Sequence, residues 1–220
     1  MIKQLKNCVT VVFLLVLSLR WGNAEEMAEL KIIHWDGASE LRQYPVNAEK
    51  FGTYFGKTVV EIVGLENFPN LRELWFSRVP FMRDFNFLRG LDALETLVFF
   101  LVTITDIDFL YDLTSLRELV FQGASLEGKI DASRLPNLEY FEFSQSRLTN
   151  LPIKIVERGN INTINISGNN ITDISSVYDM GILVLVHVNP IPNTGNPNIL
   201  TGGWDVFFRS LPERYRRFLP

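Results

Sequence analysis

Cysteine and histidine are nearly absent from this chain. Its 220 residues include one cysteine, Cys8, and two histidines, His34 and His187. A lone cysteine forms no disulfide within the chain and supplies no cysteine-rich metal site. The H-E-x-x-H spacing and a Gly-rich phosphate loop are missing as well, and no motif marks a Ser-His-Asp triad. We therefore expect no enzyme, no catalytic residue, no metal site and no cofactor.

The chain also lacks an apolar run of membrane-spanning length at its amino terminus. Lys3 and Lys6 precede a mostly apolar run of eleven residues, 9–19, and small residues end at Ala24. This order is typical of a secretion signal cleaved after Ala24. An uncleaved membrane anchor is the alternative, but a span needs about 20 apolar residues. We expect residues 1–24 to be removed, no stable membrane span to remain, and a periplasmic, secreted or cell-surface location.

Basic side chains are in short supply once this segment is removed. Cleavage takes away three of the 21 basic residues and none of the 25 acidic ones, which leaves 18 against 25 and a net charge of −7. An acidic surface argues against nucleic acid, whose phosphates require Lys and Arg. The mature chain also contains no cysteine, which fits a bacterial exported protein better than a eukaryotic one.

One pattern of three apolar positions recurs through the middle of the chain. The starts of its six copies are 23, 22, 22, 23 and 22 residues apart. A fixed period of this size indicates a solenoid, because so short a unit cannot bury its apolar face alone. The copies are Leu71-x-x-Leu74-x-Phe76, Leu94-x-x-Leu97-x-Phe99, Leu116-x-x-Leu119-x-Phe121, Leu138-x-x-Phe141-x-Phe143, Ile161-x-x-Ile164-x-Ile166 and Leu183-x-x-Val186-x-Val188.

Between the copies, apolar residues step by three, as in Ile107, Leu110 and Leu113. This spacing favours a short 3₁₀ segment, whose side chains repeat every third residue. Acidic residues precede three of these ladders and are predicted to cap their turns: Asp84, Asp106 and Asp173. We expect the middle residues of the triplets to form one buried spine: Leu74, Leu97, Leu119, Phe141, Ile164 and Val186.

The stretch Ile104-Thr-Asp-Ile-Asp-Phe-Leu-Tyr-Asp-Leu-Thr-Ser-Leu116 closely resembles the 22-residue units of bacterial internalin-like leucine-rich repeat proteins. Leu148-Thr-Asn-Leu-Pro-Ile-Lys-Ile155 resembles a 23-residue variant of the same family. The resemblance implies an α/β repeat fold, a leucine-rich repeat solenoid with a concave parallel β-sheet and short 3₁₀ or irregular segments on the convex side. It covers residues 59–191, beginning with a half-repeat at Val60-Glu-Ile62.

The chain departs from the family at the asparagine that usually joins successive turns. The five positions read Val79, Val102, Ala124, Ser146 and Asn169. We expect the first three turns to be held by apolar packing instead.

Both ends of the predicted solenoid need covering. We assign residues 25–58 to an amino-terminal cap and residues 192–220 to a carboxy-terminal cap. In the latter, Trp204, Phe207, Phe208 and Leu211 follow a helical spacing, which predicts an amphipathic helix over the last unit. The basic tail is either a solvated face of this cap or a contact for anionic surfaces: Arg209, Arg214, Arg216 and Arg217.

The residues flanking the middle apolar position of each triplet are predicted to point onto the concave sheet. An apolar cluster forms there over the first units, and acidic residues surround it. Clustered exposed aromatic residues with charged neighbours are typical of a binding site; alternatively, the amino-terminal segment covers them or they merely suit a strand. The candidate residues are Trp75, Val98, Phe100, Val120 and Tyr140, with Glu73, Glu118 and Glu142.

A further column alternates in charge and is predicted to form ion pairs that set strand register: Arg72, Glu95, Arg117 and Glu139.

These features predict a non-enzymatic exported repeat protein that binds another protein through its concave sheet. The expected partner has an apolar anchor and basic flanks. One alternative is a glycan or lipopolysaccharide binder that uses Trp75, Phe100 and Tyr140 for stacking; another is a periplasmic structural or assembly protein. A role at a bacterial surface is implied only by the internalin-like resemblance.

Overall fold

The computed structural model describes residues 25–53, 58–157, 159–186, 189 and 199–201. The predicted signal segment, His187 and nearly all of the predicted carboxy-terminal cap lie outside the described residues. No helix in the described part of the chain combines the length and apolar character needed to span a membrane.

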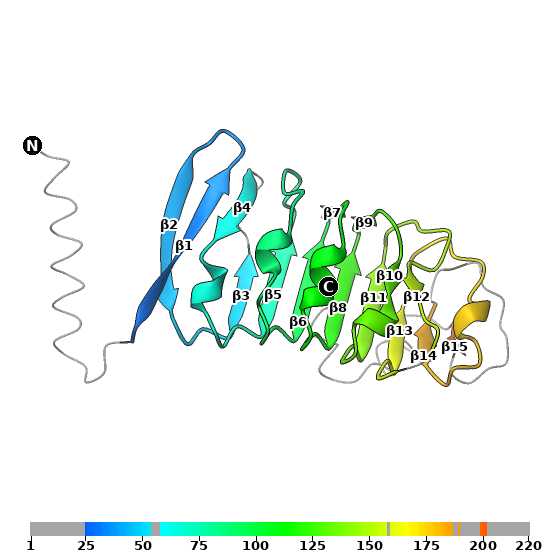
Figure 1. Ribbon diagram of the computed structural model, residues 1–220. Coiled ribbons are helices and arrows are strands. Elements are labelled where there is room, and N and C mark those ends of the chain that lie inside the picture. Colours follow the sequence, from blue (N-terminus) through cyan, green and yellow to red (C-terminus); the bar gives the residue numbers. More distant parts are fainter. Residues whose placement is uncertain (1–24, 54–57, 158, 187–188, 190–198, 202–220) are drawn as a thin grey trace, which may run out of the picture.

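An eight-stranded parallel sheet runs along the molecule, one strand for each turn of the chain (Figure 1). Its spatial order is β15-β14-β13-β11-β8-β6-β5-β3, and every neighbouring pair is parallel. This arrangement confirms the predicted leucine-rich repeat solenoid. The strands are β3 (Lys50–Thr53), β5 (Glu73–Ser77), β6 (Thr96–Phe100), β8 (Glu118–Gln122), β11 (Tyr140–Ser144), β13 (Thr163–Asn165), β14 (Leu183–Leu185) and β15 (Ile199–Leu200).

The predicted buried spine is confirmed over its first five members. Each pairs with the next across the sheet and has no exposed surface. They are Leu74, Leu97, Leu119, Phe141 and Ile164. Phe51 of β3 pairs with Leu74 and extends the spine by one strand toward the amino terminus.

The predicted register of the last unit is wrong by two residues. Val184, not Val186, pairs with Ile164, and Leu183 pairs with Thr163. A shift of two residues leaves the alternation of faces within the strand unchanged, because strand side chains alternate with a period of two. Because every residue from 182 to 186 is apolar, the apolar pattern does not determine which of them pair with β13.

Short 3₁₀ segments and two small parallel ladders form the opposite, convex side. Asp84, Asp106 and Asp173 each accept a hydrogen bond from the backbone N–H two residues later, as their predicted capping role requires. The 3₁₀ segments are η1 (Leu65–Asn67), η2 (Asn86–Leu88), η3 (Asp108–Asp112), η4 (Ala132–Arg134) and η5 (Ser175–Val177). The ladders pair β7 (Thr103–Ile104) with β9 (Ser125–Leu126), and β10 (Ile130–Asp131) with β12 (Ile153–Lys154).

A three-stranded antiparallel sheet stands at the amino-terminal end of the solenoid (Figure 1). It contains β2 (Ser39–Pro45), β1 (Met27–His34) and β4 (Val59–Val63), in that order. The predicted half-repeat at 60–62 lies in β4 and so pairs with β1, whereas β3, within the predicted cap 25–58, belongs to the solenoid sheet. The main core continues from the solenoid into this sheet through Leu30, Ile32 and Ile62.

Phenylalanine rings form the centre of the main core. Phe76 stacks on Phe99 at 5.5 Å between ring centroids, and Phe121 stacks on Phe99 at 5.3 Å and on Phe143 at 4.9 Å. Rings at corresponding positions of successive units therefore touch. Such aromatic contacts contribute about 0.5–1.5 kcal/mol each beyond the area they bury.

The turns of the first units are held by apolar packing, as predicted. Val79, Val102 and Ala124 are all buried. Asn169 instead uses its amide: Nδ2 donates to the carbonyl oxygens of Phe143 and Ile166 at 2.6 and 2.8 Å. Its Oδ1 accepts from the backbone N–H groups of Ser146 and Leu148 at 3.0 and 3.1 Å.

Asn189 joins the backbone of neighbouring turns in the same way, one turn later. Its Nδ2 donates to the Ile166 carbonyl at 2.6 Å and its Oδ1 accepts from the Ile171 N–H at 3.0 Å. The repeat pattern did not predict this role for Asn189, because the last turn is two residues shorter than the pattern assumed.

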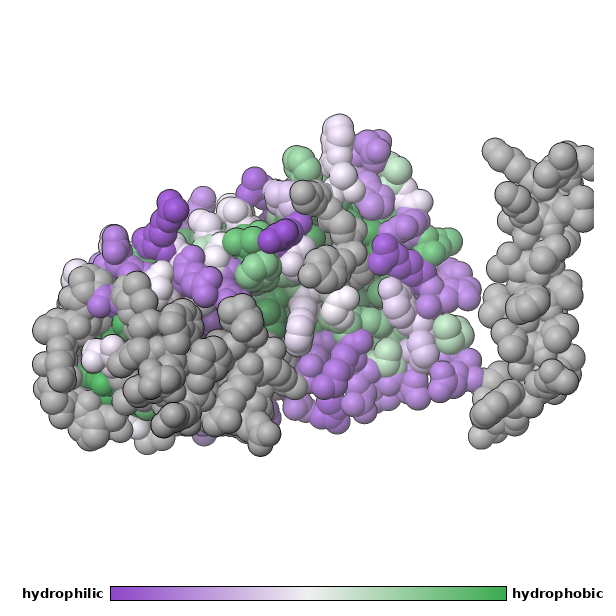
Figure 2. Space-filling view, turned by 180° about the vertical axis from the view of Figure 1, so that it is seen from behind, coloured by the Kyte–Doolittle hydropathy of each residue, from purple (hydrophilic) through white to green (hydrophobic). Residues whose placement is uncertain are grey.

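Ion pairs lie at the edge where the strands begin. Arg72 pairs with Glu95 and Arg117 pairs with Glu139, which confirms the predicted charge ladder. Hydrophilic side chains gather along this lower edge in the amino-terminal half of the molecule (Figure 2). Because both arginines are about half exposed, water screens each pair, and we assign it only a few tenths of a kcal/mol.

Candidate functional site

The strand register places all eight candidate residues on one face of the sheet. Glu73, Thr96, Glu118 and Tyr140 pair in sequence across four strands, as the first outward column requires. The second column pairs Trp75, Val98, Val120 and Glu142, and continues to Asn165 and Leu185. Phe100 lies in a third column between Ser77 and Gln122. The predicted residues therefore lie together on one face of the sheet, as the alternation of the triplets indicated.

Four side chains on this face form an apolar cluster that is separate from the main core. We call it the concave cluster: Val98, Val120, Tyr140 and Leu185, with Trp75 and Leu183 packed against it. Leu183 and Leu185 were not among the predicted site residues: Leu183 was assigned to the start of a triplet, and Leu185 was predicted on this face but outside the apolar cluster. The alternating apolar residues at 183 and 185 were the signal for them.

The prediction that this cluster is exposed is wrong for most of its members. Val98 retains 8% of its exposure, Val120 1% and Tyr140 none. Glu118 and Glu142, predicted as an exposed rim, are buried as well. Trp75, Phe100 and Glu73 remain partly exposed. Alternation predicts which face a side chain takes, but it carries no information about a second layer over that face.

Burial along the second column increases from one end of the sheet to the other. Gly52 is exposed and Trp75 is partly exposed. Val120, Asn165 and Leu185 have an exposed fraction of 1% or less. The accessible part of the concave face therefore lies over β3 and β5 and at Phe100 of β6, and the buried part extends from Val98 to β14.

Glu142 is the buried carboxyl group of this face. It accepts hydrogen bonds from the Tyr140 hydroxyl at 2.6 Å and from the Ser144 hydroxyl at 2.5 Å. Burial raises the pKa of Glu142 above its ordinary value of 4.5, and hydrogen bonds from Ser144, Tyr140 and Asn165 oppose this only in part. The site thus holds a carboxyl group that favours its neutral form more than an exposed glutamate does.

The two other acidic residues have partners nearer the edge of the sheet. Glu118 accepts a hydrogen bond from the Thr96 hydroxyl at 3.2 Å. Glu73 forms an ion pair with Lys50 at 2.8 Å. Arg78 lies over the Phe100 ring, with its guanidinium carbon 5.9 Å from the ring centroid. The accessible end of the face therefore combines two aromatic rings with charges of both signs.

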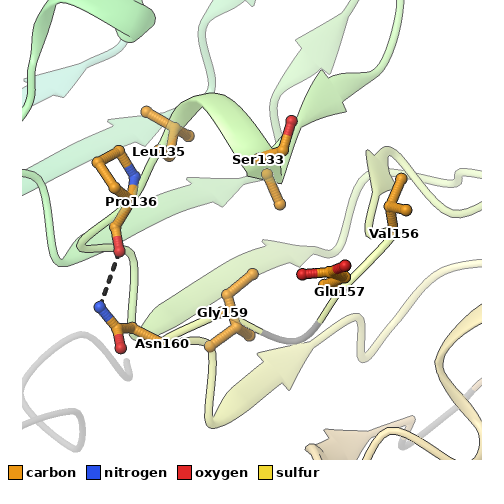
Figure 3. A pocket seen from close by; sticks show the side chains of 9 residues that line it. Ser133, Leu135, Pro136, Val156, Glu157, Gly159 and Asn160 are labelled. Carbon is orange, nitrogen blue, oxygen red and sulfur yellow. Dashed lines mark hydrogen bonds between the residues drawn. The ribbon is translucent and has the colours of Figure 1, made fainter.

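A second hollow, on the convex side, offers little chemistry. It has a volume of about 500 Å³ and lies between η4 and residues 156–157 and 159–161 (Figure 3). Asn160 closes one side by donating to the Pro136 carbonyl at 2.8 Å. Glu157 contributes the carboxyl group of the lining. The Ser133 hydroxyl donates a hydrogen bond to Asp131. Nothing in this lining pairs a nucleophile with a base.

No group of three or more potential metal-ligating residues occurs among the residues that the structure describes. His34, one of the two histidines, shares a hydrogen bond of 2.8 Å with the Thr58 hydroxyl at the amino-terminal end of the molecule. It lies away from the concave cluster, in the antiparallel sheet.

Comparison with known proteins yields structural similarity alone. The chain matches no protein-family model and no curated protein sequence. An internalin (inlF) from Listeria monocytogenes superposes with a TM-score of 0.44 and 18% identity, over 66% of this chain and 51% of the internalin. Internalin C2 (inlC2) from the same species gives 0.36 and 20%, over 63% and 54%. This chain spans about half the length of both structures, and the fold assignment rests on the strand register above.

Proposed function

We propose that this leucine-rich repeat solenoid is a non-enzymatic protein that binds another protein through its concave sheet. The observation that carries the proposal is the concave cluster, an apolar group on the face opposite the main core. A solenoid buries enough apolar surface between its sheet and its convex segments to be stable. The partly exposed end of the second apolar group, at Trp75, is therefore available for recognition.

The chemistry of this face favours a partner with an apolar anchor and basic flanks. Trp75 and Phe100 supply aromatic surface on neighbouring strands, and both rings are partly exposed. Val98, Val120 and Tyr140 continue the apolar row as buried side chains, with Glu73, Glu118 and Glu142 around them. Aromatic residues beside complementary charge provide much of the energy in protein interfaces.

A glycan is the alternative ligand for the same residues. Trp75 and Phe100 have the partial exposure that stacking on a sugar requires. Tyr140 lacks this exposure, because its ring is fully buried and its hydroxyl donates a hydrogen bond to Glu142. A face with two accessible rings and a longer buried apolar row fits a protein anchor better than a sugar.

Export is part of the proposal and is supported by the residue pattern of 1–24. Expression of the full chain in a bacterial host, followed by mass measurement of the protein recovered outside the cytoplasm, tests it. The expected product begins at Glu25.

Affinity capture tests the binding proposal. The processed chain serves as bait in an extracellular fraction, beside a Trp75→Ala/Phe100→Ala variant. Phe81→Ala is the matched control, because Phe81 is 51% exposed and lies outside the three outward columns. We expect a protein to be retained by the wild type and by Phe81→Ala and lost by the double variant. Equal retention by all three chains refutes the proposed surface, and retention of protein-free glycan supports the alternative.

A further inference from the structure

The antiparallel sheet at the amino-terminal end has an edge with which no described strand pairs. β2 lies at the end of the order β2-β1-β4, so only one of its sides is bonded to a neighbour (Figure 1). Leu41, in the middle of β2, is a large apolar side chain that is 63% exposed. An edge strand presents backbone N–H and C=O groups to any strand that can pair with it. β2 is therefore a surface on which another strand can be added.

The ladder between β1 and β2 determines which backbone groups of β2 point outward. At one end of the ladder the His34 N–H donates to the Ala38 carbonyl at 2.9 Å, and at the other end the Val46 N–H donates to the Glu26 carbonyl at 2.8 Å. Hydrogen-bonded and non-hydrogen-bonded pairs alternate along an antiparallel ladder. The register between these two ends therefore directs the N–H and C=O groups of every second residue away from β1. The residues with outward N–H groups are Ser39, Leu41 and Gln43.

The sequence around Leu41 is complementary to itself in an antiparallel pair. A two-fold axis through Leu41 places this residue opposite its own copy, and it places Glu40 opposite Arg42 of the second copy on both sides of the axis. The same axis places Ser39 opposite Gln43. All three residues with outward N–H groups then lie in hydrogen-bonded pairs, while the charged residues lie in the non-hydrogen-bonded pairs, where side chains approach most closely.

The two charged side chains are already in position at this edge. The Arg42 guanidinium donates to the Glu40 carboxylate at 2.6 Å within the chain, and the two side chains are 36% and 44% exposed. Residues two apart in a strand share one face of the sheet. A second copy in this register adds its own pair beside the first, with opposite charges adjacent. Opposite charges at directly facing positions stabilise strand pairing.

Leu41 lies on the other face of the sheet, in a row with Lys31 and Val63. Val63 is also exposed, at 41%. Pairing of two β2 edges brings the two copies of Leu41 into contact, because facing residues in a hydrogen-bonded pair lie about 5.5 Å apart. The contact removes an exposed apolar side chain of each copy from water, which favours association.

Other two-fold registers of the same strand are less favourable. An axis one residue away from Leu41 in either direction passes through Glu40 or Arg42 and places like charges against each other. An axis through Gln43 places Leu41 opposite Pro45, which has no N–H group to donate. The charges that usually keep an edge strand from pairing therefore oppose every register but one.

We propose that β2 pairs with β2 of a second copy of this chain, antiparallel and centred on Leu41. The two three-stranded sheets then form one continuous six-stranded antiparallel sheet, β4-β1-β2-β2-β1-β4. The contact is the same on both copies, so it closes at two molecules and does not propagate. Because a single strand edge is a small interface, the dimer is weak and its population depends on concentration.

Sedimentation velocity of the full chain, from about 1 µM to about 1 mM, measures this dimer. Leu41→Pro should abolish it by removing the central N–H donor, while the β1–β2 ladder stays intact, because proline is accepted where the N–H of an edge strand faces solvent. Leu41→Thr is the matched control: it keeps the N–H group and suits a strand, so a dimer should remain. Circular dichroism and the urea midpoint of the monomer should stay unchanged in both variants.

A charge exchange tests the register. Glu40→Arg and Arg42→Glu, each alone, place two like-charged pairs across the axis and should weaken the dimer about tenfold. An equimolar mixture of the two variants should recover the wild-type affinity, because every pair across the axis then joins an arginine of one chain to a glutamate of the other. The double variant Glu40→Arg/Arg42→Glu should recover it within a single chain.

Three outcomes overturn the proposal. A wild type that stays monomeric at every concentration removes the dimer. A dimer that survives in Leu41→Pro belongs to another surface. Charge variants that do not recover on mixing place the axis elsewhere. β2 contains none of the eight candidate residues of the concave face, so this experiment and the affinity capture fail independently.

Discussion

At the scale of single residues, a left-handed backbone position follows the strands of successive units. The φ angle is 53° at Arg78, 54° at Leu101, 60° at Gly123, 53° at Gln145 and 70° at Gly168. Glycine adopts this conformation without steric cost, whereas other residues lose about 1–2 kcal/mol. Space decides where glycine is needed: a Cβ on Gly123 would lie 2.6 Å from Cδ2 of Leu101.

Replacement of Gly123 by alanine should therefore destabilise the protein by about 1–2 kcal/mol through its backbone conformation alone, with a further steric cost from Leu101. Urea unfolding measures the change. Introducing Leu101→Gly should remove the steric part, so the two substitutions should show favourable coupling in a double-mutant cycle. Strictly additive effects would contradict the close contact.

Glu142→Gln should stabilise the protein at neutral pH. The raised native pKa of Glu142 means that the folded state binds its proton more tightly than the unfolded state. Its stabilising contribution is complete below the unfolded value near 4.5 and is lost as pH rises through the native pKa. Each pH unit between the two pKa values corresponds to about 1.4 kcal/mol.

Urea midpoints at a series of pH values measure this effect. The variant should exceed the wild type at pH 7, and the difference should disappear below the unfolded pKa. A variant that is less stable than the wild type at pH 7 would show that Glu142 works as a charged group. Glu157→Gln is a suitable control, because Glu157 is exposed.

At the scale of elements, the solenoid uses two ways to hold its turns. Buried Val79, Val102 and Ala124 serve the first turns, while Asn169 and Asn189 join the later turns through backbone hydrogen bonds. The change coincides with a loss of large rings, because the triplets of the fifth and sixth units contain Ile and Val where the earlier ones contain Phe. Side-chain hydrogen bonds thus join the turns in the part of the solenoid where aromatic packing is reduced.

Asn169→Ala should destabilise the protein by about 3 kcal/mol, because it leaves two carbonyls and two N–H groups around a buried position without their partner. Chemical unfolding measures the loss. The control is Asn170→Ala at the exposed neighbouring position, where little change is expected. Similar losses in the two variants would mean that the amide bridge adds little to stability.

At the scale of the whole molecule, each unit contacts mainly its neighbours, so stability passes from unit to unit. The stacked rings of Phe76, Phe99, Phe121 and Phe143 join four successive units. The loss of one ring from this row should therefore destabilise the adjacent strands more than distant ones.

Phe121→Ala should lower stability by about 3–5 kcal/mol, the usual cost of deleting a buried ring. Hydrogen exchange should rise more in β6 and β11, which flank β8, than in β14. Phe81→Ala, at an exposed ring, is the control. An equal rise in all strands would show that the solenoid opens as one cooperative unit.

Much of the fold was predictable from the apolar repeat. Five spine residues, the capping aspartates and the ion pairs Arg72–Glu95 and Arg117–Glu139 occupy their predicted places. The register at Leu183 was not predictable, because a two-residue slip leaves the alternation of apolar residues unchanged. The place of β3 in the sheet was also missed, because Lys50–Thr53 is a single short strand outside the repeat.

The candidate site also has one property that was predictable from the sequence and one that was not. Its eight residues share one face because side-chain direction follows from local backbone geometry, which the sequence determines by itself. Whether that face meets water depends on chain segments far apart in sequence, and only the tertiary structure decided that Val120, Tyr140 and Glu142 are buried. Periodicity is a local property of the chain, whereas burial is a property of everything packed above it.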